Sequence, residues 1–182
     1  MDFAITDNTR FDANKRLDSD QRVSIPCDRL TSEVTLNTTL VYRLAALYFA
    51  TLERSVGALI KVNVDRQGIE LIVRGRRAAL RFGTGIPEIT PSRAAIGWPI
   101  TGGWALDGSA DGRGTFHIGA EWDDVRENLS LFTRVENYTP SLTGPKASPL
   151  RGLAYSLTQR KLHKLFTHRF LAEATRELMR ET

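Results

Sequence analysis

Residues 60–82 read IKVNVDRQGIELIVRGRRAALRF, and this stretch indicates a sheet of short antiparallel strands. Apolar and polar side chains alternate from Ile60 to Val64, which is the period of a strand with one buried face. Gln67-Gly68 and Arg74-Gly75-Arg76 are turn candidates between apolar runs. Three strands are therefore predicted, at Ile60–Val64, Ile69–Val73 and Ala78–Phe82. Strands joined by turns this short pair as antiparallel hairpins.

The sheet is predicted to continue on both sides of this stretch. Further strands are expected at Gln21–Cys27, Ser92–Ile100, Arg113–Trp122 and Leu129–Tyr138, which gives six to eight in all. Gly83–Pro91 is predicted to be a loop, and Pro99 is expected to end a strand or to lie at an edge.

Two helices are predicted to pack against this sheet. From Asn37 to Val56, apolar residues recur at the spacing of one helix face, with Asn37 or Thr38 as the cap and Gly57 just beyond the end. Residues 139–149 contain three prolines and a glycine, as a linker would. The last helix begins after it, either at Ser148-Pro149 or at Ser156.

A strand, a helix, a run of strands and a long C-terminal helix make an α+β protein. This order of elements resembles the helix-grip arrangement of START-like and polyketide-cyclase-like proteins, in which a curved antiparallel sheet wraps the last helix around an apolar cavity. A lipocalin-like β-barrel with appended helices is the alternative. Residues 23–182 are predicted to form one domain, and the polar residues 1–22 an N-terminal arm without an ordering core of its own.

The charge is concentrated in the C-terminal segment. Residues 151–182 carry seven basic and three acidic residues, which accounts for the whole formal net charge of +4. An apolar stripe along the predicted helix favours docking onto the sheet, which leaves the basic side outward. That side could bind an anionic partner surface through Lys161, Lys164, His168, Arg169 and Arg176. Interleaved glutamates and the lack of a nucleic-acid motif argue against nucleic acid as the partner.

The resemblance implies a cavity, and the sequence offers residues to line it. The wall is predicted to come from Trp98, Trp104, Phe116 and Phe132, and the floor from Leu162, Phe166 and Phe170. Ordinary core packing is the alternative reading of these aromatics. His163 lies near the apolar stripe and is the candidate catalytic proton donor or acceptor if the helix faces a cavity.

Other chemistries find little support. Residues 107–112 match half of a calcium loop, but Ile118 stands where the bidentate glutamate belongs, so a hairpin turn is expected there. His117 and Glu121 lie four residues apart on a strand, roughly 13 Å, and cannot share one metal ion. Cys27 is the only cysteine, and phosphate-loop and dinucleotide motifs are absent from the sequence. Neither a metal nor a cofactor is predicted.

These observations lead to a ranked set of functions. The first is the binding of a small apolar molecule between the sheet and the C-terminal helix. The others are an interaction or assembly protein that docks through the basic helix and the N-terminal arm, and a cyclase-like or dehydratase-like enzyme that uses His163. The sequence is compatible with binding to a protein partner or to a second copy of the chain. The N-terminus lacks a signal-peptide pattern and no apolar run is long enough to span a membrane, so a cytoplasmic location is expected.

Overall fold

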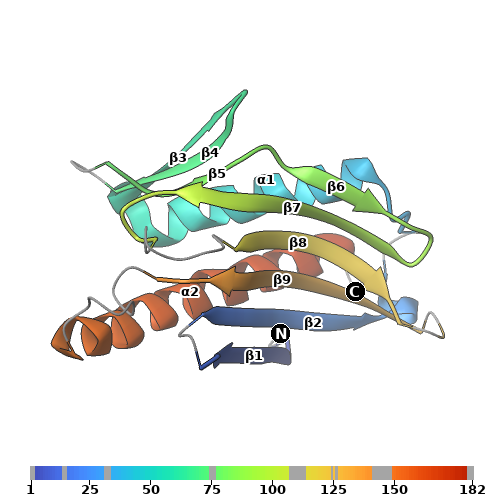
Figure 1. Ribbon diagram of the computed structural model, residues 1–182. Coiled ribbons are helices and arrows are strands. Elements are labelled where there is room, and N and C mark those ends of the chain that lie inside the picture. The colour runs from blue at the N-terminus through green and yellow to red at the C-terminus, as the bar shows by residue number, and fades with distance from the viewer. Residues whose placement is uncertain are drawn as a thin grey trace.

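The computed structural model is an α+β fold with an open antiparallel sheet and two long helices (Figure 1). It describes residues 3–13, 16–30, 34–73, 77–106, 114–123, 125, 127–140 and 149–179, with the side chains of residues 56, 58 and 149–163 left out. Nine strands lie in these ranges: β1 (Ile5–Phe11), β2 (Leu17–Pro26), β3 (Ile60–Asp65), β4 (Gly68–Val73), β5 (Ala78–Phe82), β6 (Ile86–Ile89), β7 (Arg93–Gly102), β8 (Thr115–Trp122) and β9 (Asn128–Tyr138).

The strands are ordered β1-β2-β9-β8-β7-β5-β4-β3, and β6 pairs with β7 beside this path. Every pairing is antiparallel. The two edges, β1 and β3, lie at opposite ends of this order, so the described strands form an open sheet and not the closed barrel of the alternative prediction.

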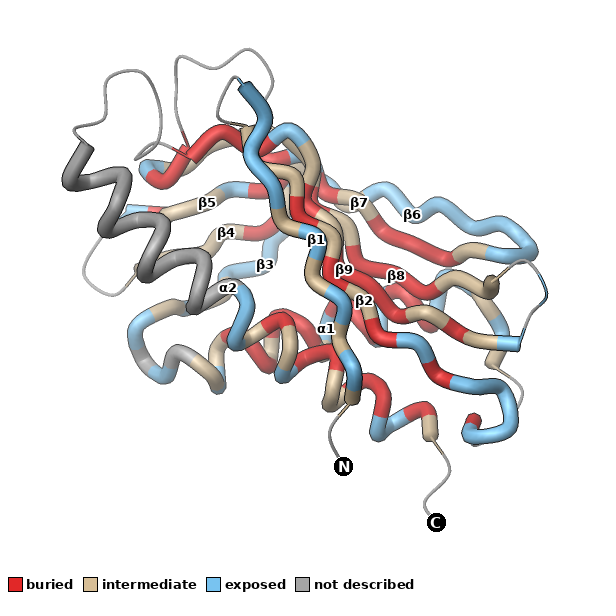
Figure 2. Tube along the Cα trace, turned by 90° about the horizontal axis from the view of Figure 1, so that it is seen from below, coloured by how far each residue is buried: buried red, intermediate tan, exposed pale blue. Residues whose placement is uncertain are grey.

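Both helices cover the same face of the sheet, as Figure 2 shows in a view turned by 90°. α1 (Thr38–Val56) packs on β3, β7 and β8, and α2 (Pro149–Leu178) packs on β2 and β9. Polar contacts join the helices, because Glu173 accepts hydrogen bonds from Thr51 at 2.7 Å and from Arg54 at 2.6 Å. Burial of the apolar face of each helix against the sheet contributes more to its stability than its intrinsic helix propensity does.

The alternation of the sequence explains the core. Leu129, Leu131 and Val135 of β9 point to the helices and are buried. On α1 and α2, the buried residues include Leu44, Leu52, Phe170 and Leu171, which have at most 3 % of their surface exposed. The sheet's inner face and the helices therefore share one hydrophobic core.

The helix prediction for residues 37–56 is confirmed down to its caps. Asn37 is extended, and its side-chain oxygen accepts a hydrogen bond from the backbone N–H of Leu40 at 2.9 Å. Gly57 follows the helix with φ of +57°, a conformation that side-chain-bearing residues rarely adopt.

We expect Asn37→Ala to lower the free energy of unfolding by about 1 kcal/mol, because the Leu40 N–H loses its partner. Urea denaturation measures this loss, and Asn37→Ser is the control that keeps a capping oxygen. Equal stability of the alanine and serine variants would contradict the capping role.

Three sequence predictions differ from the structure. Residues 5–11 and 17–20, in the predicted arm, belong to the β1–β2 hairpin, which joins the sheet through β9. The strand predicted at Gln21–Cys27 is confirmed as the second half of β2. Ile86–Ile89, predicted as part of a loop, pairs with β7 as β6. Pro99 neither ends β7 nor lies at a sheet edge, since the strand continues to Gly102 and Pro99 is aligned with Thr115 of β8. The turn predicted at residues 107–112 lies outside the described residues.

Candidate functional site

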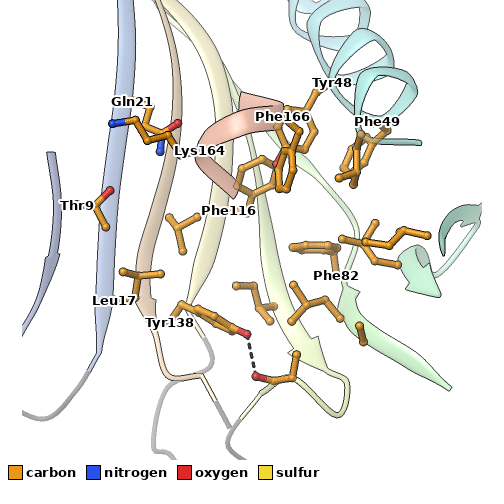
Figure 3. A pocket seen from close by; sticks show the side chains of 18 of the residues that line it. Thr9, Leu17, Gln21, Tyr48, Phe49, Phe82, Phe116, Tyr138, Lys164 and Phe166 are labelled. Carbon is orange, nitrogen blue, oxygen red and sulfur yellow. Dashed lines mark hydrogen bonds between the residues drawn. The ribbon is translucent and has the colours of Figure 1, made fainter. Parts of the chain in front are cut away.

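A cavity of about 230 Å³ lies between the inner face of the sheet and the two helices (Figure 3). Side chains from both ends of the sheet and from both helices line it. Its apolar wall includes Phe11, Leu17, Tyr48, Phe49, Leu52, Ile60, Leu71, Val73, Leu80, Phe82, Ile100, Trp104, Phe116, Val135, Tyr138 and Phe166. Asp7, Thr9, Gln21 and Lys164 add polar groups.

Packed aromatic rings form one side of the cavity. The ring of Tyr48 lies 5.0 Å from that of Phe116 and 6.2 Å from that of Phe166, measured between centroids. Phe82 lies 5.9 Å from Phe116 on the sheet side. Rings in such tilted and edge-to-face contacts stabilise one another beyond the burial of their surface.

Two tyrosines line the cavity, Tyr48 and Tyr138. Tyr138 donates a hydrogen bond to the carbonyl oxygen of Ala105 at 2.8 Å, which Figure 3 marks with a dashed line. Burial raises the pKa of Tyr48 well above its ordinary value, and the nearby Thr167 hydroxyl opposes this only in part. Tyr48 therefore stays neutral at physiological pH.

The polar end of the cavity lies where β1, β2 and α2 meet. Lys164 of α2 reaches β1, with its ammonium 3.3 Å from a carboxylate oxygen of Asp7. Burial tends to raise the pKa of Asp7, but the Thr9 hydroxyl and the Lys164 charge outweigh this, and the pKa lies below its ordinary value. Thr9 also lies 2.9 Å from the hydroxyl of Ser19. The positive charge of Lys164 and the negative charge of Asp7 therefore form a pair at this end of the cavity.

The structure separates the predicted wall and floor residues, together with His163, into four groups. Trp104, Phe116 and Phe166 line the cavity. Trp98 and Phe170 are buried on the same side of the sheet but pack behind the lining, against Phe49 and Tyr48 respectively. Leu162 and the candidate catalytic His163 lie in α2, and their side chains are outside the described residues.

Phe132 lies on the opposite face of the sheet, away from the cavity. Its ring is fully buried beneath the guanidinium groups of Arg22, Arg93 and Arg134, at 5.5, 4.6 and 5.6 Å from the ring centre. It is therefore not a wall residue. Arginine stems and cation–π contacts can bury a phenylalanine on an outer sheet face as well as a core can.

Carboxylates hold these three arginines over the ring. Asp20 accepts hydrogen bonds from Arg22 and Arg134, at 2.7 and 3.0 Å. Glu121 pairs with Arg22 and with Arg93. Burial tends to raise the pKa of Asp20, but the hydrogen bonds and charges of the two arginines outweigh it, and the pKa lies below the ordinary value.

This arrangement predicts a loss of stability in acid. A carboxyl group whose pKa is lower in the folded state stabilises the fold fully above its unfolded pKa of about 4. The contribution of Asp20 is then lost as the pH falls from there through its depressed folded pKa. We expect Asp20→Asn to be less stable than the wild type at pH 7 and to approach the wild type as the pH falls through the depressed folded pKa, as measured by urea denaturation. A difference that stays constant with pH would contradict this.

The predicted basic surface is largely engaged within the protein. Lys164 pairs with Asp7, Arg169 lies 3.2 Å from Glu173, and Arg176 lies over the ring of Phe3 at 5.9 Å. Burial, then the Lys164 charge, lowers the pKa of the half-buried His168. The Lys161 side chain is outside the described residues.

Sequence reasoning missed the polar end of the cavity because it lies in the predicted arm. The signal was an interrupted alternation: Ser19 and Gln21 occupy the inward register of β2 that Val23 and Ile25 continue. Two buried polar residues in such a row indicate a polar pocket.

Two negative findings concern the described part of the chain. Its helices include none that is both long and apolar enough to cross a membrane. Nor do its His, Cys, Asp and Glu side chains form a group of three or more that could hold a metal ion.

Comparison with known proteins gives a distant structural likeness. No protein-family model matches the chain, and no curated protein sequence matches it. The crystal structure of CalU16 from Micromonospora echinospora is similar with a TM-score of 0.28 and 9 % sequence identity, over 97 % of this chain and 93 % of that one.

Proposed function

We propose that this protein binds a small, mostly apolar molecule in the cavity between the sheet and the two helices, in a helix-grip arrangement. The observation that carries the proposal is the 230 Å³ space lined by aromatic and aliphatic side chains. A packed core leaves few voids larger than a water molecule, and apolar voids lose contact energy in their lining. A ligand that fills this space restores those contacts.

The size of the cavity limits the ligand. An apolar cavity of about 150 Å³ admits benzene. The larger space here therefore suits a molecule of one or two rings. Trp104, which lines the cavity and is 41 % exposed, reaches from it to the surface and marks a path by which a ligand can enter.

Calorimetric titration with p-xylene and naphthalene tests the proposal. For ligands of this size a dissociation constant of about 100 µM is expected. Ala79 lines the cavity from β5, so Ala79→Phe should fill it and weaken the binding of both probes at least ~10-fold. Asn63→Phe adds the same ring at an exposed position of β3 and is the matched control.

Circular dichroism checks that both variants keep the fold. The proposal is wrong if neither probe binds the wild type, or if Ala79→Phe and Asn63→Phe bind the probes equally well.

A further inference from the structure

We propose that Gln21 accepts a hydrogen bond from a neutral hydroxyl group of the ligand, so that the ligand is an apolar alcohol or phenol. This inference rests on the proposed function, because it names the polar group of a molecule held in the same cavity. It begins from one side chain of β2, which Figure 3 shows beside Lys164 at the edge of the cavity.

The fold forces Gln21 to point inward. Its alignment with Thr133 of β9 places it in the same row as Val23 and Ile25, which belong to the core. Only 1 % of its surface is exposed, and its side chain lines the cavity. An apolar residue here would continue the alternation of β2 and would complete an apolar wall.

The amide oxygen of Gln21 is buried and has no hydrogen-bond partner in the described structure. The nearby polar groups contact other residues: Lys164 pairs with Asp7, and Thr9 contacts both Asp7 and Ser19. Leaving a buried acceptor unsatisfied is unfavourable, so nearly all such groups in proteins have a partner. The missing partner must be a donor, and the cavity is the space from which it can come.

The surrounding charges select a neutral donor over an acid. A ligand carboxylate would meet the amide oxygen of Gln21 and the carboxylate of Asp7, which both repel it. The one cation that lines the cavity among the described residues, Lys164, is already neutralised by Asp7. A hydroxyl group satisfies the acceptor without adding charge.

Four toluenes that differ only in the para substituent separate the possibilities. p-Cresol carries a hydroxyl donor, and p-xylene replaces it by a methyl group of similar volume. 4-Methylanisole keeps the oxygen without the donor, and p-toluate carries an anion. Each is titrated calorimetrically into the wild type, into Gln21→Met and into Gln67→Met, which makes the same change in an exposed turn.

The wild type and Gln67→Met should bind p-cresol about tenfold more tightly than p-xylene or 4-methylanisole, and p-toluate most weakly. In Gln21→Met the preference for p-cresol over p-xylene should disappear, because the hydroxyl then loses its acceptor. Unchanged p-xylene affinity shows that the variant keeps its cavity. If Gln21→Met does not fold, the ranking of the four probes on the wild type decides.

Equal affinity of the wild type for p-cresol and p-xylene, or for p-cresol and 4-methylanisole, overturns this inference and leaves the proposed function standing. Persistence of the p-cresol preference in Gln21→Met overturns it as well. If none of the probes binds, the inference falls together with the proposed function.

Discussion

Phe132→Ala is expected to lower the free energy of unfolding by about 3 kcal/mol while leaving the affinity for p-xylene unchanged. The ring is fully buried, but it lies on the sheet face opposite the cavity, beneath three guanidinium groups. Its loss removes both the apolar contact and the ring that the three cations share. Gly119 leaves room for this ring, since a Cβ there would lie 2.8 Å from the Phe132 Cζ atom.

Urea denaturation and calorimetric titration measure the two effects in one preparation. Phe132→Leu is the control, because it keeps most of the buried volume and should lose less stability. A decrease in the free energy of unfolding below about 1 kcal/mol would show that the Phe132 ring contributes little to the stability of the outer face. A weaker affinity for p-xylene would show that the two faces are coupled.

Phe116→Ala should have the larger effect on stability, a loss of about 4 kcal/mol, and should also change which ligand is preferred. Phe116 is 3 % exposed, lines the cavity and contacts the rings of Tyr48, Phe82 and Trp98. Its removal joins the vacated volume to the existing cavity. The affinity for naphthalene relative to p-xylene should therefore rise.

Thermal denaturation with and without each probe reveals this change, because a ligand that binds the folded state raises its melting temperature. Phe132→Ala is the matched control, since it deletes the same ring on the other face. A naphthalene preference that is identical in the two variants would contradict the placement of Phe116 in the cavity wall.

The fold was predicted best where apolar residues repeat with the period of a strand or of a helix and polar residues fill the other positions. Residues 60–82 and the helix at 37–56 followed their periods, and the structure confirms both. β1 and the first half of β2 were not predicted, because their inward positions include Asp7, Thr9 and Ser19, which interrupt a hydrophobic alternation. The same polar residues that prevented the prediction of these strands lie at the polar end of the candidate site.

Phe132 shows a second limit. The alternation of β9 already placed it on the face of Arg134 and Glu136, opposite Leu131 and Val135, but its size and apolarity suggested a wall residue. Periodicity assigns a side chain to a face, whereas hydrophobicity alone does not say what covers it. The three arginines that do so come from β2, β7 and β9, and only the folded chain brings them together.

The position of β2 between β1 and β9 has a consequence for how the chain folds. Asp20 and Arg134, 114 residues apart, must meet before this part of the sheet exists. Closing so long a loop is slow relative to forming local hairpins such as β3–β4. During synthesis on the ribosome, the β1–β2 hairpin therefore waits unpaired along β2 until β9 emerges, and the polar end of the cavity is among the last parts to assemble.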